Sequence, residues 1–151
     1  MEKEPKPPRI IVPGGLNVDL TGLGVERLVG PGELTLGGTL RIGPGGKARN
    51  MAQMAGTYLG PGRVAMIGRT SRDPFGLWRV PLRSLEEAGV AIDRVRVTSL
   101  EEAGGRLPGA ALIAVDRQGR NQIYVLPGAN LDFGPGEVEA ADALFTPAPG
   151  T

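Results

Sequence analysis

The chain has 151 residues, and 17 Lys and Arg against 16 Asp and Glu give a net charge of +1, which indicates no nucleic-acid-binding surface. It contains neither Cys nor His, which excludes disulfides, thiolate nucleophiles, Cys-ligated metals and a Ser-His-Asp arrangement. Its apolar runs are shorter than the roughly 18 residues of a spanning helix, and the lead of residues 1–8 has no signal-type apolar stretch. We therefore expect a cytoplasmic protein with a disordered lead and no membrane partner.

The first half of the chain predicts short elements separated by glycine and proline. Residues 9–13 form a short apolar run typical of a buried strand, and GGLNVDL, residues 14–20, is interpreted as the turn after it. Residues 33–42 contain two β-type runs around Gly37-Gly38, which predicts a hairpin. Residues 48–59 predict a helix that ends before Gly60. Its expected core face is an apolar stripe of Met51, Met54, Ala55, Tyr58 and Leu59, with Arg49, Gln53 and Thr57 away from that stripe.

The second half continues the alternation of strands and helices. Residues 63–68 and 94–98 predict strands, and a helix between them is expected to begin at Asp73 as N-cap and to be kinked by Pro81. The remaining predictions are a hairpin of 110–116 and 121–127 around RQGR, a short helix at 136–141 and a core strand at 143–147. This order favours an α/β sheet with a small β flap.

The glycine-rich stretch RIGPGGKARN, residues 41–50, precedes the predicted helix and raises the question of a phosphate or nucleotide site. A Walker loop is excluded, because Arg41 stands at its first glycine and Ala48 at its Ser or Thr. Residues 43–48 satisfy the dinucleotide pattern G-x-G-x-x-A, but the next strand has no acidic residue at its tip for a ribose. The dinucleotide interpretation stays open as the weaker alternative.

A polyol site is a third interpretation of this stretch. Gly45 and Gly46 let the backbone approach a ligand, while Lys47 and Asn50 supply hydrogen-bond donors. A carboxylate after the first strand, Asp19, could accept hydrogen bonds from two adjacent hydroxyls, and Asn17 precedes it by two residues. The alternative for Asn17 and Asp19 is that they cap a turn, and Lys47 alone would be an ordinary surface lysine.

The same residues carry a family resemblance. Gly14-x-x-Asn17-x-Asp19, followed by Gly45-Gly46-Lys47-x-x-Asn50, resembles the ribokinase-like (PfkB) carbohydrate kinases. Three further segments resemble that family in the same order: VAMIGRTSRDPFG (64–76), LEEAGV (85–90) and ALIAVDRQGRNQIYVLPGAN (111–130). The resemblance covers residues 9–147 and implies a Rossmann-like, ribokinase-like partial α/β sheet with a β lid formed by about 33–42 and 110–126.

The resemblance also implies an activity and a site. Family members transfer a phosphoryl group from ATP, with Mg²⁺, to a hydroxymethyl group of a sugar or nucleoside, and the lids of some relatives pair two subunits. By similarity, the substrate-binding residues are Asn17, Asp19, Gly45, Gly46, Lys47 and Asn50. No catalytic residue or metal ligand is predicted, because nothing after Ala129 resembles the Gly-Asp motif of the family's later half.

Three hypotheses follow from this reading. The first is the substrate-binding half of an ATP-dependent sugar kinase that is inactive alone, with residues 148–151 as a tail and the ATP-binding half absent. The second is a non-catalytic sugar-binding or regulatory module, and the third is a dinucleotide-binding domain. Residues 98–109 replace a compact segment that the family would place before the hairpin, which leaves Arg106 without a predicted role.

Overall fold

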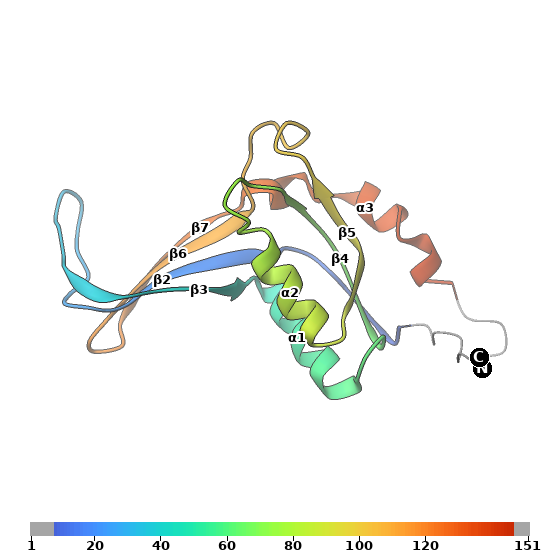
Figure 1. The fold of residues 1–151 in the computed structure, drawn as a ribbon, viewed down its shortest axis with the longest axis horizontal. Coiled ribbons are helices and arrows are strands. Elements are labelled where there is room, and N and C mark those ends of the chain that lie inside the picture. The colour runs from blue at the N-terminus through green and yellow to red at the C-terminus, as the bar shows by residue number, and fades with distance from the viewer. Residues whose placement is uncertain (1–7, 147–151) are drawn as a thin grey trace.

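The computed structural model describes residues 8–146, which form a mixed α/β structure with two sheets (Figure 1). The expected lead, apart from Pro8, and the expected tail lie outside the described residues. Strands β1 (Ile10–Pro13), β4 (Val64–Ser71) and β5 (Ala91–Thr98) form a parallel sheet in the order β1-β4-β5. This central sheet confirms the α/β fold class expected from the sequence.

The core lies between the central sheet and two helices, α1 (Lys47–Leu59) and α2 (Arg79–Glu87). These helices lie side by side on one side of the sheet, and α3 (Pro135–Glu139) lies on the other (Figure 1). β4 is the middle strand, and its apolar start, Val64 to Ile67, is fully buried, as expected for a parallel strand covered on both faces. The buried apolar cluster consists of Val12, Leu16, Ala52, Val64, Met66, Leu82, Leu85, Val90 and Val95.

A second sheet projects away from this core and is called the projecting sheet here (Figure 1). Its strands are β2 (Asn17–Val25), β3 (Gly37–Gly45), β6 (Gly109–Asp116) and β7 (Asn121–Leu126), in the order β3-β2-β6-β7. The pair β2–β6 is parallel, and the pairs β2–β3 and β6–β7 are antiparallel. The predicted hairpin around residues 117–120 is confirmed, and Asp116 closes it by accepting hydrogen bonds from the backbone N–H groups of Gln118 and Arg120.

Two predictions for the projecting sheet were wrong. The expected turn at residues 14–20 becomes the strand β2 from Asn17 onward, and the expected hairpin across Gly37-Gly38 does not form. Instead both glycines begin β3, which pairs along its whole length with β2. Gly37 and Gly38 have φ of 85° and 84°, so they serve to bend the chain into the strand rather than to reverse it.

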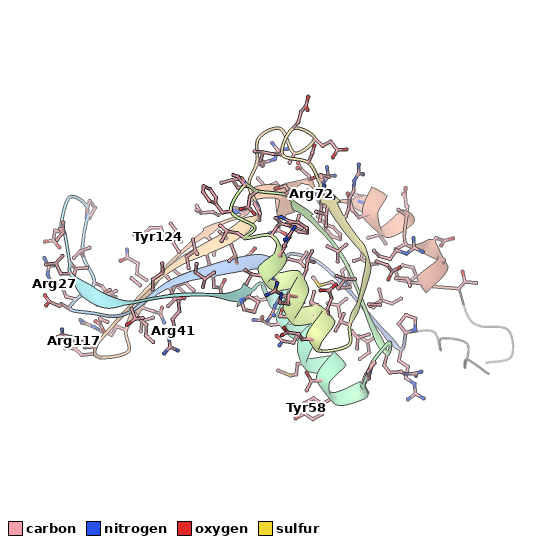
Figure 2. All side chains as sticks on the ribbon, in the orientation of Figure 1. Arg27, Arg41, Tyr58, Arg72, Arg117 and Tyr124 are labelled. Carbon is pink, nitrogen blue, oxygen red and sulfur yellow. The ribbon has the colours of Figure 1, made fainter. Side chains whose placement is uncertain are left out.

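The buried face of α1 also differs from the prediction. Met51, Met54 and Tyr58 are exposed, so Met51 and Met54 are not core residues. The face that packs on the sheet is made of small residues, Ala48, Ala52, Ala55 and Gly56, together with the buried Arg49. A Cβ at Gly56 would lie 2.6 Å from Val90 Cγ2, which shows how closely α1 approaches the connection between α2 and β5. Tyr58 projects from the outer surface of α1 (Figure 2).

Other boundaries shift for local reasons. α2 begins at Arg79 rather than at Asp73, because the Asp73 carboxylate accepts hydrogen bonds from the backbone N–H groups of Phe75 and Trp78 in a preceding turn. Pro81 falls in the first turn of α2, where its missing N–H has no helical acceptor to lose, so no kink is needed. A core strand at 143–147 is not formed: Asp142–Leu144 are a 3₁₀ turn, η2, and residue 147 lies outside the described part.

The remaining segment, η1 (Gly128–Asp132), follows β7 and contacts β4. Two ion pairs fasten it and α3 to the core: Arg106 with Asp132, and Arg69 Nη1 with Glu137 Oε1 at 3.0 Å. These pairs give Arg106 a structural role and leave Arg69 partly buried. No helix among residues 8–146 is long and apolar enough to cross a membrane.

Candidate functional site

The candidate site lies where the chain leaves the central sheet for the projecting sheet. β1 ends at Pro13, three residues connect it to β2, and the connection is anchored by Leu16, which is buried in the core. The Gly14 N–H donates to the Ile67 carbonyl at 3.0 Å, which holds this connection beside the middle strand β4. Because β1 and β4 are parallel, the connection lies at the carboxyl ends of the strands, where α/β proteins bind ligands.

Two glycines at the end of β3 let the backbone approach this connection closely. A Cβ at Gly45 would overlap the Asp19 carboxylate, so the carboxylate lies directly against the Gly45 Cα. Gly46 has a φ of 95°, and a Cβ there would lie 2.8 Å from the Gly15 carbonyl oxygen. Both positions therefore exclude a side chain for steric reasons, in addition to any contact with a ligand.

Asn130, at the end of the PGAN segment, positions Asn17. Its Oδ1 accepts a hydrogen bond from the Leu16 N–H at 3.0 Å, and its Nδ2 donates to the Leu16 carbonyl at 3.1 Å and to Asn17 Oδ1 at 2.8 Å. Since a backbone N–H can act as a donor and not as an acceptor, it fixes which way the Asn130 amide is turned. With Oδ1 of Asn17 occupied, its Nδ2 is left for a ligand. The sequence offered no role for Asn130 beyond its place in a motif.

The Asp19 carboxylate is half-buried and faces the same side of the projecting sheet as its neighbours in register, Gly43 on β3 and Ala111 on β6. Burial raises the pKa of Asp19, because a carboxylate loses hydration there, and the positive charge of Arg49 opposes this rise. Asp19 is the acidic side chain that lines the candidate cavity, and its binding role stays a prediction.

The first turn of α1 supplies the remaining polar groups. Lys47 and Asn50 both line the site, and both are exposed. Arg49 lies between them and is 4% exposed, although the sequence placed it on the solvent face of the helix. Its guanidinium donates to Asn50 Oδ1 and to Ser84 Oγ on α2. Arg49 thus contacts a residue of the candidate site. The apolar periodicity of α1 gave no sign of this, because it placed Arg49 away from the expected core face.

These groups surround one cavity of about 770 Å³. It brings together five of the six predicted site residues, Asn17, Asp19, Gly46, Lys47 and Asn50, while Gly45 lies directly behind the Asp19 carboxylate. Apolar side chains of the projecting sheet form the opposite wall. The full lining is Gly15, Asn17, Asp19, Gly46, Lys47, Ala48, Asn50, Ala111, Ile113, Ile123, Val125, Pro127 and Asn130.

The cavity combines several hydrogen-bond donors with one acceptor carboxylate. Lys47 and the amides of Asn17 and Asn50 are able to donate to a ligand, and an ionised Asp19 is able to accept. An apolar wall with a few converging polar groups is typical of a small-molecule site. Within residues 8–146 no three His, Cys, Asp or Glu side chains come together in a way that could hold a metal ion. The arrangement suits binding of a polyhydroxylated molecule.

The dinucleotide interpretation does not fit this geometry. Residues 43–45 belong to β3, which pairs antiparallel with β2, so the G-x-G-x-x-A letters do not follow a strand of the parallel sheet. A dinucleotide fingerprint requires a parallel strand that leads directly into the helix. Here the parallel strand β1 leads into β2 instead, and the glycines serve to accommodate Asp19 and the Gly15 carbonyl.

Comparison with known proteins identifies relatives over nearly the whole chain. A family model described as "pfkB family carbohydrate kinase" matches residues 8–148. A bifunctional ribokinase/ribose-5-phosphate isomerase A of Fructilactobacillus sanfranciscensis is 34% identical over 133 residues, which cover 87% of this chain and 23% of that protein. Ribokinase of Arabidopsis thaliana is 28% identical over 137 residues, which cover 91% of this chain and 34% of that protein.

Solved structures agree with the sequence matches. A ribokinase from Giardia lamblia has a TM-score of 0.74 at 26% identity, covering 92% of this chain and 39% of that one. The structure of Arabidopsis thaliana ribokinase complexed with ribose and ATP has a TM-score of 0.66 at 28% identity, covering 82% of this chain and 37% of that one. The present chain therefore spans about a quarter to two fifths of the length of these relatives.

Proposed function

This chain belongs to the pfkB family of carbohydrate kinases, and we propose that it forms the substrate-binding region of a ribokinase-like, ATP-dependent sugar or nucleoside kinase. The observation that supports this proposal is the single cavity on which Asn17, Asp19, Lys47 and Asn50 converge. In this assignment Asp19 accepts hydrogen bonds from two sugar hydroxyls, while the two amides and Lys47 donate to hydroxyl oxygens. Gly45 and Gly46 allow the sugar and the Asp19 carboxylate to lie against the backbone.

We assign the projecting sheet as a lid over the sugar. The face that carries Asp19 also carries Ala111, Ile113, Ile123 and Val125, which line the cavity. An apolar lid would exclude water from the reacting hydroxyl, which a kinase needs because water would otherwise accept the phosphoryl group.

The opposite face of this sheet supports a second proposal, that two copies of the chain pair through their lids. Ile42, Leu20, Leu112 and Tyr124 form one cross-strand row in register on that face. Ile42, Leu112 and Tyr124 are 51%, 42% and 57% exposed, and the neighbouring Leu40 is 69% exposed. A continuous apolar row of this kind is more typical of an interface than of a solvated strand. A second copy would cover the row with an identical row.

The cofactors of the proposed reaction are ATP and Mg²⁺. The Arabidopsis thaliana ribokinase structure contains ribose and ATP, and a ribokinase of Cryptococcus neoformans var. grubii was solved in complex with ADP. Phosphoryl transfer needs a metal and charge-stabilising groups around the phosphates. In the described part of the chain, no carboxylate cluster of the metal-holding kind is present. We therefore assign these residues to sugar binding and no step of phosphoryl transfer to them.

Calorimetry of the chain against ribose, fructose, fructose 6-phosphate and adenosine tests this function, with Asp19→Ala alongside. We expect saturable binding of at least one of these compounds and its loss in Asp19→Ala, while ATP turnover by this chain alone is not expected. Binding that is unchanged in Asp19→Ala would contradict the assigned site. NAD binding that is lost in a bulky variant of Gly45 and kept in Asp19→Ala would instead favour the dinucleotide alternative.

A further inference from the structure

Arg49 is a buried cation without a carboxylate partner. Its side chain is 4% exposed, and among residues 8–146 no Asp or Glu oxygen lies within ion-pair distance of it. Burying a guanidinium in this way costs free energy, and burial indeed lowers the pKa of Arg49. The proposed function does not use this residue, so its place in the core calls for an explanation.

The guanidinium connects α2 to the candidate site. Nη1 donates to Ser84 Oγ at 2.6 Å, and the Ser84 hydroxyl in turn donates to the Pro81 carbonyl at 2.8 Å. On its other side, Nε donates to Asn50 Oδ1 at 3.1 Å, and Nη2 donates to the same oxygen. Arg49 is therefore held between two acceptors, of which one belongs to a residue that lines the cavity.

These contacts determine how the Asn50 amide is turned. A guanidinium has five N–H donors and no acceptor, so the atom that faces it must be the amide oxygen. The two N–H bonds of Asn50 Nδ2 are then left for the cavity, and no hydrogen bond from Nδ2 occurs within the described residues. Without Arg49 the amide could rotate and present either an oxygen or a nitrogen to the ligand.

The positive charge of Arg49 also interacts with the carboxylate of Asp19. Arg49 is the cation whose charge opposes the effect of burial on the pKa of Asp19. Arg49 itself does not line the cavity, and Lys47 on α1 is the cationic residue that does. The strands packed beside Asp19 contribute four residues that do not titrate, Gly43 and Gly45 from β3, Ala111 from β6 and Val125 from β7. The next residue of β3 on this face is Arg41, which pairs in register with Thr21.

We propose that Arg49 is a positioning residue, which turns Asn50 so that the site presents an amide donor beside the Asp19 acceptor. The ligand must then place a hydroxyl oxygen against Asn50 Nδ2 and a hydroxyl proton against Asp19, which a single hydroxyl or two neighbouring hydroxyls of one polyol can do. The assignment of the ligand class rests on the proposed function, whereas the orientation of Asn50 and the charge on Asp19 do not.

Four variants test this role. Arg49→Met removes the donors and the charge at similar length, and Arg49→Lys keeps one charged donor. Asn50→Asp keeps an oxygen toward Arg49 but offers no N–H to a ligand. Arg83→Met is the matched control, because Arg83 is an exposed arginine on α2 that lies near Ser84 and has no contact with Asn50. Each variant is measured by thermal melting, by ribose calorimetry and by NMR titration of the Asp19 carboxyl without sugar.

We expect the Asp19 pKa to rise in Arg49→Met and to stay near the wild-type value in Arg49→Lys and Arg83→Met. Ribose affinity should fall about tenfold or more in Arg49→Met, since a charge-assisted hydrogen bond no longer holds Asn50, and should recover in part in Arg49→Lys. Asn50→Asp should melt no lower than the wild type and yet lose ribose binding. If Arg49→Met does not fold, Arg49→Lys and Asn50→Asp still decide the question.

An Asp19 pKa that is the same in Arg49→Met and the wild type, or ribose binding by Asn50→Asp equal to that of the wild type, would overturn the positioning role. If the wild type itself does not bind ribose, the proposed function fails for that sugar. The Asp19 titration, together with the Asn50 side-chain N–H signals in Arg49→Met, then still decides whether Arg49 positions the site.

Discussion

Asp19 lies in a position that disfavours its own charge. Because burial raises its pKa in the folded protein, folding favours the protonated form. Below the ordinary pKa of 3.8, Asp19 is protonated in both the folded and the unfolded chain, so its burial costs no charge desolvation. As the pH rises from there through the raised pKa of the folded state, the carboxyl ionises and the free energy of unfolding falls. A carboxylate kept at such a cost is typical of a functional site rather than of a turn cap.

We therefore expect Asp19→Asn to melt at the same temperature as the wild type or higher at pH 7, with an advantage that shrinks as the pH falls toward 4. Sugar affinity should fall by roughly 10- to 100-fold, because a charged acceptor becomes a neutral one. Melting curves across this pH range and calorimetry measure the two effects, with the exposed Asp93→Asn as control. A large loss of stability in Asp19→Asn at pH 7 would argue for a structural carboxylate.

Gly45 and Gly43 allow a matched test at the same strand end. A Cβ at Gly45 would overlap the Asp19 carboxylate, whereas a Cβ at Gly43 would meet nothing within 4 Å. Gly45→Ala should displace the carboxylate, a side chain that can rotate away, and so weaken sugar binding about tenfold or more with a loss of stability of about 1–3 kcal/mol. Gly43→Ala should change neither quantity appreciably. Calorimetry and urea denaturation of the two variants provide the comparison, and equal affinities would show that the position of Asp19 does not matter.

At the scale of elements, one loop residue joins segments that are far apart in the chain. Asn130, which follows β7, satisfies both backbone groups of Leu16, which precedes β2, and one atom of Asn17. Asn130→Ala would leave these partly buried groups without partners, and we expect a loss of about 1–3 kcal/mol in the free energy of unfolding. Urea denaturation measures it, with Asn121→Ala on the exposed start of β7 as control. Equal stabilities of the two variants would mean that water replaces Asn130.

The buried face of α1 is not the face that its apolar periodicity predicts. Its large apolar residues mark a regular stripe, yet its small residues form the buried face because the sheet and Val90 lie too close for anything larger. Packing depends on shape as well as on hydrophobicity, and Gly and Ala permit the shortest helix contacts. Periodicity alone could locate the helix but not the side that faces the core.

At the scale of the whole molecule, the projecting sheet leaves one apolar face uncovered. If two copies pair through it, Tyr124→Lys should convert a dimer to a monomer, because it places a charge at the β7 end of the row that pairing would bury. Tyr58→Lys is the control, since Tyr58 is 85% exposed on α1, far from that sheet (Figure 2). Sedimentation velocity at several concentrations measures the mass. A wild-type monomer at high concentration would contradict the pairing.

The sequence by itself determined the α/β class, most element positions, the family and the six candidate site residues, because local patterns of apolar residues and short motifs carry that information. The binding roles of those six residues stay predictions. Tertiary structure decided that residues 17–25 form a strand, that Met51 and Met54 face outward, and that Asn130 and Arg49 reach the site. These features depend on partners that are distant in the chain, such as Ser84, 35 residues from Arg49, and Leu16, 114 residues from Asn130. Local sequence patterns cannot specify such contacts, since they arise when distant segments pack together.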